Sequence, residues 1–207
     1  LITELPEAMF ELPQGRTRGF DFAANPLSIE SRNRIKTYVR ETSHDFEVPA
    51  DPFDIELARQ LFPALDEQGA SDMIYGLPGT LAQGRNQLRH WRAERETLRS
   101  ELSAWTTQSS ATHPVTGEQR TPLELYDDYR ARSEFREQVL RLWESRSDTG
   151  MRNDIFEANL GFSGDMPNLT ADFSHVLTLD FTGNATIRDL GEFLDLFPHA
   201  QILKMRD

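Results

Sequence analysis

Apolar and polar positions alternate most clearly in the segment from Val176 to Asn184. Its apolar residues Val176, Leu179 and Phe181, closed by Asn184, fit the L-x-x-L-x-L-x-x-N pattern of a leucine-rich repeat. Leu179 and Phe181 are two residues apart, so in an extended strand they point to the same face. An asparagine amide can bond the backbone groups that a tight turn leaves open. The segment therefore predicts the short strand and turn of one repeat.

The same spacing recurs on both sides of this segment. Ile155, Ala158 and Leu160 take the equivalent offsets in an earlier segment, and Ala200, Leu203 and Met205 take them in a later one. The steps from Ile155 to Val176 and from Val176 to Ala200 both fall within the range of about 20–29 residues for this repeat class. Near the N-terminus, Phe20, Phe22 and Asn25 fill three of the four offsets. The spacing therefore predicts repeat strands at both ends of the chain.

Between these ends the periodicity is helical. Ser28 is placed to cap a helix over about 29–41, and shorter helices follow the linker at 43–52. The strongest pattern covers about 81–106, where leucines and tryptophans at heptad spacing form one apolar seam. The segment Thr121-Pro122-Leu-Glu124 then combines a threonine cap, a proline at the first position and a glutamate at the third. It predicts a second long helix, over about 122–146, antiparallel to the first.

The predicted fold is thus mainly α, with short parallel leucine-rich-repeat strands at both ends and a central helical hairpin or bundle. Residues 1–42 are expected to be the end of one repeat block with its capping helix. Residues 43–150 would form a helical domain, and residues 151–207 the start of a second repeat block. We expect a piece of a longer protein, because the chain begins with Leu and starts and stops inside repeat patterns.

Charge and cysteine content narrow the possible functions. The 207 residues carry 34 acidic and 22 basic side chains, a formal net charge of −12, which argues against nucleic acid as a partner. No apolar run approaches the roughly 18 residues of a membrane-spanning helix. The chain has no cysteine, so it can form no disulfide, thiolate metal site or cysteine nucleophile.

Several short motifs resemble a known group of proteins. They are Leu5-Pro6, Asn25-Pro-Leu-Ser28, Gly76-Leu-Pro-Gly79, Trp91, Leu142-Trp143, Asp165-Met-Pro-Asn-Leu169 and Phe193-Leu-Asp-Leu-Phe-Pro198. Together they resemble large bacterial leucine-rich-repeat toxins and effectors, mostly of pseudomonads, akin to the type III effectors that carry a novel E3 ubiquitin ligase domain. Met166-Pro167 looks like a variant of the Leu-Pro step that these repeats favour.

The resemblance implies a virulence-associated parent protein that is secreted or translocated into a host cell; without it we would expect the bacterial cytoplasm. In that family the ligase works through a cysteine in a Cys-x-Asp setting, and this chain has no cysteine. The ligase chemistry of such a parent therefore cannot reside in these residues, and no catalytic residue is carried over.

The candidate catalytic groups have ordinary structural interpretations. The five histidines (His44, His90, His113, His175 and His199) are dispersed and lack metal-ligand spacing. The three carboxylates of 124–128 could do acid–base work only if burial displaced one pKa, and we expect them to form a solvated helix face. The three tryptophans lie on apolar helix sides and are expected in the core. We predict no cofactor and no metal.

The feature favoured for function is the repeat surface. In a solenoid, the residues between the core positions of each strand contact partners. Here the candidates are Thr178, Asp180 and their counterparts Lys204 and Asp21. The sequence therefore predicts a non-catalytic, monomeric protein-recognition segment whose partner is a host protein or another domain of the parent. The alternatives are that the helical part is an enzyme in its own right, or that it is a purely structural spacer.

Overall fold

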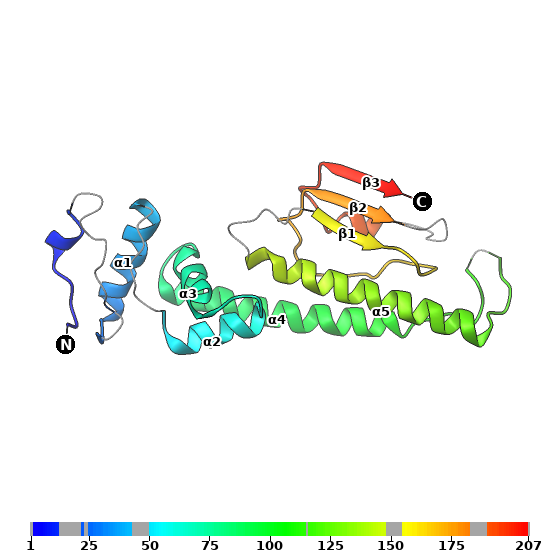
Figure 1. Cartoon of the computed structure of the whole chain (residues 1–207), viewed down its shortest axis with the longest axis horizontal. Coiled ribbons are helices and arrows are strands. Elements are labelled where there is room, and N and C mark those ends of the chain that lie inside the picture. The colour runs from blue at the N-terminus through cyan, green and yellow to red at the C-terminus, as the bar shows by residue number, and fades with distance from the viewer. Residues whose placement is uncertain are drawn as a thin grey trace. The chain divides into compact units, whose positions relative to one another are not determined.

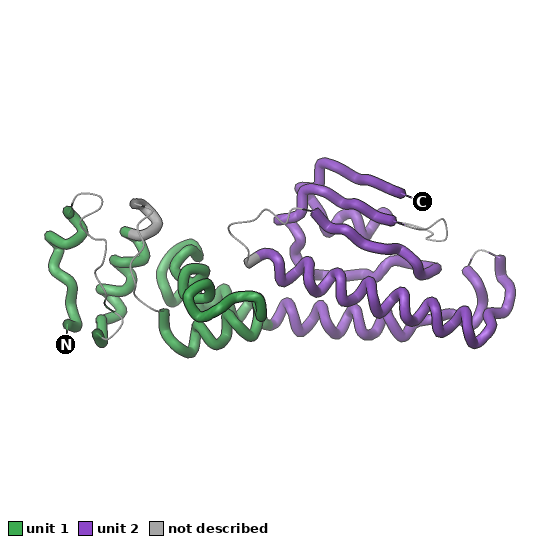
Figure 2. Tube along the Cα trace, viewed as in Figure 1, with its two compact units in different colours: residues 1–92 green, residues 93–207 purple. Residues whose placement is uncertain are grey.

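The computed structural model describes residues 2–12, 22, 25–42, 50–114, 116–147, 155–182 and 190–206. The described chain is mostly helical, with one small parallel sheet (Figure 1). It falls into two compact units, Leu1–Arg92 and Ala93–Asp207, shown in two colours in Figure 2. None of the described helices is long and apolar enough to cross a membrane.

The first unit is built from short helices and one end of a long helix. They are η1 (Glu7–Met9), α1 (Ile29–Thr42), α2 (Pro52–Leu61), α3 (Glu67–Gly76) and the first half of α4 (Leu81–Thr106). The Ser28 hydroxyl accepts a hydrogen bond from the Ser31 N–H, so the predicted cap of α1 forms. The Asp51 carboxylate caps α2 in the same way, with Pro52 at the first position. These local signals fix where the helices begin, and tertiary packing fixes their buried sides.

The predicted N-terminal strand lies largely outside the described residues. Of the residues that support it, the structure describes Phe22, which is buried, and Asn25. The Asn25 side-chain oxygen accepts a hydrogen bond from the Ile2 N–H at 2.9 Å. This bond places the asparagine amide beside the chain's first residues, and the predicted strand itself stays a prediction.

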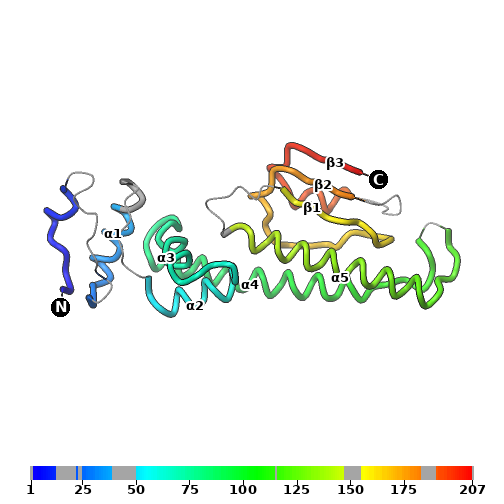
Figure 3. The backbone as a smooth tube through the Cα atoms, viewed as in Figure 1, coloured from blue at the N-terminus to red at the C-terminus, as the bar shows by residue number. Residues whose placement is uncertain are grey.

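Two long helices run beside each other in the second unit (Figure 3). They are the second half of α4 and the whole of α5 (Pro122–Glu144), and α5 is followed by the short 3-10 helix η2 (Ser145–Ser147). Near one end of the pair Arg95 bonds Glu144, and near the other Arg132 donates to the Trp105 carbonyl oxygen at 3.2 Å. The early residue Arg95 of α4 thus meets the late residue Glu144 of α5, and the late residue Trp105 meets the earlier Arg132, so the two helices are antiparallel. The predicted capping box at Thr121 and Glu124 is formed at the start of α5.

The sheet has three parallel strands in the order β1-β2-β3 (Figure 1). They are β1 (Ile155–Asn159), β2 (Thr178–Thr182) and β3 (Ile202–Arg206). The short helix α6 (Gly191–Leu194) lies between β2 and β3 in the chain. The three predicted C-terminal segments therefore do lie side by side as parallel strands.

The predicted pairing is right for one pair of strands and wrong for the other. Phe181 lies opposite Met205, as the repeat spacing predicted. On the other side Phe181 lies opposite Ala158, whereas the spacing predicted Leu160 as its partner. A shift by two positions leaves each side chain on the same face, so alternation could not detect it. The shift places Phe156 in the core, its ring centroid 5.8 Å from that of Phe181.

The core of the second unit is rich in phenylalanine. The buried rings come from the strands, from the segments that connect them and from α5: Phe135, Phe156, Phe162, Phe173, Phe181, Phe193 and Phe197. Phe135 of α5 lies within 5.8 Å of Phe193 and 6.0 Å of Phe156 by ring centroids. The helix α5 packs next to β1, so it covers the edge of the sheet that β1 forms. The opposite strand, β3, is exposed along its whole length.

Candidate recognition face of the sheet

The outer face of the sheet is the side opposite the phenylalanine core. Successive side chains of a strand point to opposite faces, so the register determines which outer residues are neighbours. One row runs Glu157–Asp180–Lys204 and the next runs Asn159–Thr182–Arg206. We call these six residues, together with Gln138 of the adjoining α5, the recognition face. Two of the predicted candidates, Asp180 and Lys204, thus lie directly opposite each other.

Asp180 is the most buried charged residue of this face, with only 5% of its surface exposed. Its Oδ2 atom accepts a hydrogen bond from Arg206 and lies 3.8 Å from the Lys204 Nζ atom. The side chains of Arg206 and Lys204 are 59% and 48% exposed. The carboxylate is therefore held in place from β3 by two cations whose own side chains remain accessible.

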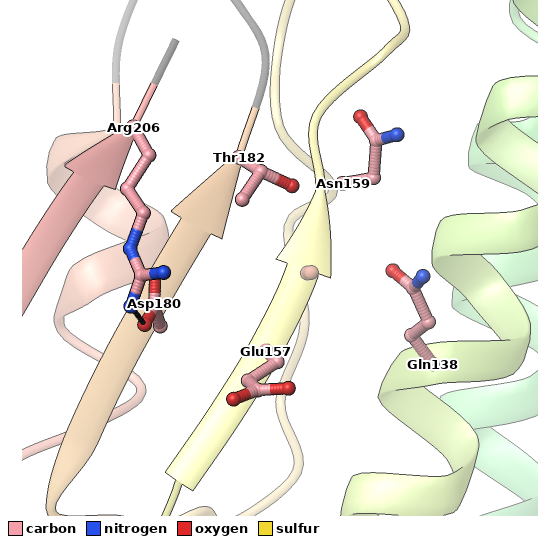
Figure 4. A pocket seen from close by; sticks show the side chains of 7 residues that line it. Gln138, Glu157, Asn159, Asp180, Thr182 and Arg206 are labelled. Carbon is pink, nitrogen blue, oxygen red and sulfur yellow. Dashed lines mark hydrogen bonds and ion pairs between the residues drawn. The ribbon is translucent and has the colours of Figure 1, made fainter.

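A hollow of about 340 Å³ opens on this face (Figure 4). It is lined by Gln138, Glu157, Ala158, Asn159, Asp180, Thr182 and Arg206. Gln138 enters it from α5 on the β1 side, and Arg206 borders it from β3. Three strands and one helix thus contribute to a single depression.

Two oxygen atoms of the hollow have no hydrogen-bond donor among the described residues. They are Asp180 Oδ1 and Gln138 Oε1, and both are buried. A buried acceptor left without a donor costs about 1–3 kcal/mol, and more when it is charged. Asp180 Oδ2 is satisfied while Oδ1 is not, so this carboxylate of the hollow's lining has unused acceptor capacity.

A buried network holds α5 against the segment that follows β1. Asp128 Oδ1 accepts hydrogen bonds from the Ser163 N–H at 2.9 Å and from its hydroxyl at 3.1 Å. Asp128 Oδ2 accepts from Arg132 Nε at 3.1 Å, and Arg132 in turn donates to the Ser163 carbonyl oxygen at 2.8 Å. Because α5 also carries Gln138, this network sets where Gln138 meets the sheet.

The same network corrects a prediction. The carboxylates of 124–128 were expected to form a solvated face, but Asp128 is only 5% exposed. Burial raises the pKa of Asp128, but four neighbours that stabilise the charged carboxylate outweigh this effect: the Ser163 N–H, Arg132, the Ser109 hydroxyl and Arg120. The pKa of Asp128 therefore lies below its usual value. Glu124 instead belongs to the capping box, and Asp127 is exposed beside Arg130.

The predicted site residues have different outcomes. Thr178 is 9% exposed, so its side chain offers little to a partner. Asp180 and Lys204 lie on the recognition face, and Asp21 is outside the described residues. The sequence reasoning missed the other members of the face. Extending the alternating pattern to Thr182 and Arg206 would have found two of them. Nothing in the sequence indicates Gln138, because polar residues are common on the exposed sides of helices.

The histidines that the structure describes occupy separate environments. His90 is exposed, and His113 Nδ1 accepts a hydrogen bond from the Thr116 N–H. His175 Nε2 lies 3.1 Å from the Leu142 carbonyl oxygen, and desolvation lowers the pKa of this imidazole. Within the described ranges, no group of three or more His, Asp or Glu side chains is placed to hold a metal ion.

Comparisons with protein-family models, with curated proteins and with solved structures gave no match. The resemblance to leucine-rich-repeat effectors therefore rests on the short motifs of the sequence. The geometry of the recognition face is independent of that resemblance.

Proposed function

We propose that this chain is a non-catalytic protein-recognition segment that binds a protein partner through the recognition face. The observation that carries the proposal is the set of outward residues from three parallel strands, aligned in two rows around a hollow. Such a surface presents many polar groups at fixed spacing. It can select a partner by shape and charge without making or breaking a bond.

The strand spacing supports a leucine-rich-repeat interpretation. Thr178 of β2 is paired with Ile155 of β1 on one side and with Ile202 of β3 on the other. Both steps along the sequence fall within the range of about 20–29 residues for this repeat class. In stacked repeats the strand residues between core positions form the partner-binding surface. Glu157, Asp180 and Lys204 have that position here.

We further propose that the parent is a bacterial effector or toxin of the kind that the motifs resemble, acting after translocation into a host cell. In a parent with a ubiquitin ligase domain, this segment would choose the protein to be modified. The transfer itself would take place elsewhere, because the chain has no cysteine to form a thioester.

Site-specific photo-crosslinking tests the proposal. A photoreactive amino acid at the exposed position Asn159 should give discrete adducts with host-cell proteins, and excess unlabelled chain should abolish them. The matched control is the exposed Glu192 of α6, which lies outside the recognition face. Equal adduct patterns from positions 159 and 192 would contradict the proposal, and so would no adduct from position 159.

A further inference from the structure

The lining of the hollow carries more negative than positive charge. Two carboxylates, Glu157 and Asp180, line the hollow against a single guanidinium, Arg206. That guanidinium already donates to Asp180 Oδ2. Within the part of the chain that the structure describes, Asp180 Oδ1 and Gln138 Oε1 have no donor. The groups that would complete this hollow are therefore N–H donors carrying positive charge.

Asp180 is built into the fold rather than displayed on a mobile side chain. It is buried on the central strand, between neighbours paired in register on both sides. A fixed carboxylate loses little freedom when a cation binds it, which favours affinity. Glu157, by contrast, is an exposed residue of the lining and can meet an approaching cation first.

We propose that the hollow receives an arginine or lysine side chain of the protein partner. The incoming cation would pass Glu157, donate to Asp180 Oδ1 and bring Gln138 Oε1 within reach of its remaining N–H groups. Arginine suits the site best, because its fork carries five donors and no acceptor. Two cations of β3 compete for Asp180, Arg206 from the lining and Lys204 beside it, and their side chains are 59% and 48% exposed. This inference rests on the proposed function, since it names the chemistry of the partner at the same face.

A selection from a random twelve-residue peptide library against the whole chain tests the inference. We expect the selected peptides to contain arginine or lysine at one shared position. Replacing that residue by citrulline or norleucine in a synthetic peptide should weaken binding, measured by fluorescence polarisation, by about tenfold or more. High salt should weaken the basic peptides as well.

Variants of the chain locate the binding. Glu157→Gln and Asp180→Asn should each weaken the peptide about tenfold, and the circular dichroism spectrum shows whether each variant folds. Arg206→Ala should strengthen binding, because it removes one of the two intrachain cations that compete for Asp180. Glu192→Gln removes the same charge as Glu157→Gln from an exposed site outside the face and should leave affinity unchanged. Thr182→Trp should block the hollow for any ligand.

The outcomes separate this inference from the proposed function. If Thr182→Trp blocks the selected peptides but these contain no basic residue, the inference is overturned and the proposed function of the recognition face is retained. Basic peptides weakened equally by Glu157→Gln and Glu192→Gln would show only general attraction to a chain of net charge −12, and would also overturn it. Selected peptides that Thr182→Trp does not affect would contradict both proposals.

Discussion

Replacing Asp128 by asparagine should destabilise the second unit more than any exposed charge change. The substitution keeps the shape of the side chain and removes its charge. Arg132 and Arg120, whose side chains are 5% and 4% exposed, would then lie beside a neutral amide. Removing one partner from a buried ion pair costs about 3–5 kcal/mol. The hydrogen bonds from Ser163 and Ser109 to the carboxylate would also weaken.

The assay is urea unfolding followed by tryptophan fluorescence. Arg132 lies over the Trp105 ring, its guanidinium carbon 4.6 Å from the ring centroid, so this fluorophore reports on the network. Urea m-values are about 1–3 kcal/mol/M, so a loss of about 3 kcal/mol moves the midpoint down by about 1 M or more. The matched control is Asp127→Asn, which removes an exposed carboxylate 3.9 Å from Arg130 and should change stability by less than about 0.5 kcal/mol.

The direction of the pH dependence follows from the same network. The pKa of Asp128 in the folded chain is below its ordinary value, so its contribution to stability is fully present above about pH 4. That contribution is lost as the pH falls through the lowered pKa, and Asp128→Asn should flatten this part of the curve. Equal unfolding midpoints for Asp128→Asn and Asp127→Asn would refute the reasoning.

Two further predictions concern the core and its edge. His175→Gln should make the free energy of unfolding less dependent on pH below about 6.5. Desolvation lowers the pKa of His175 in the folded chain, so the unfolded chain takes up a proton first as the pH falls, which destabilises the fold. Urea midpoints at pH 5.5 and 7.5 check this, and a midpoint difference equal to that of the unchanged chain would contradict it. Phe181→Ala should cost about 3–5 kcal/mol, since this ring is 1% exposed and packs against Phe156. Thr182→Ala beside it should be nearly neutral in the same titration, and similar midpoints for the two would disprove the assigned burial of Phe181.

Local chemistry was enough to predict the long helices. The start of α5 follows from Thr121, Pro122 and Glu124, whose capping bonds connect residues only three apart. The seam of α4 follows from apolar spacing along one helix, and Leu98 and Leu102 are fully buried as that spacing requires. Such signals lie within a few residues of each other, so a sequence contains them completely.

The first strand pair shows where that information ends. Alternation says which face a residue takes, and pairings of Ala158 with Leu179 or with Phe181 satisfy it equally. The choice depends on Phe156, which contacts Phe135 of α5, Phe181 of β2 and Phe197 after α6. These rings come from four different segments, and their packing is a property of the assembled core.

Burial of polar groups was harder still to predict, and it is what builds the site. Asp128 lies in an acidic run on a helix, and the groups that bury it include Ser163, far along the chain in the segment after β1. The network that results fixes α5 beside β1, and so it places Gln138 at the hollow. The proposed function would therefore couple stability and recognition through one helix: a variant that loosens Asp128 from Ser163 should also weaken binding at Gln138. Asp180, held from the far side by β3, should keep its own contribution.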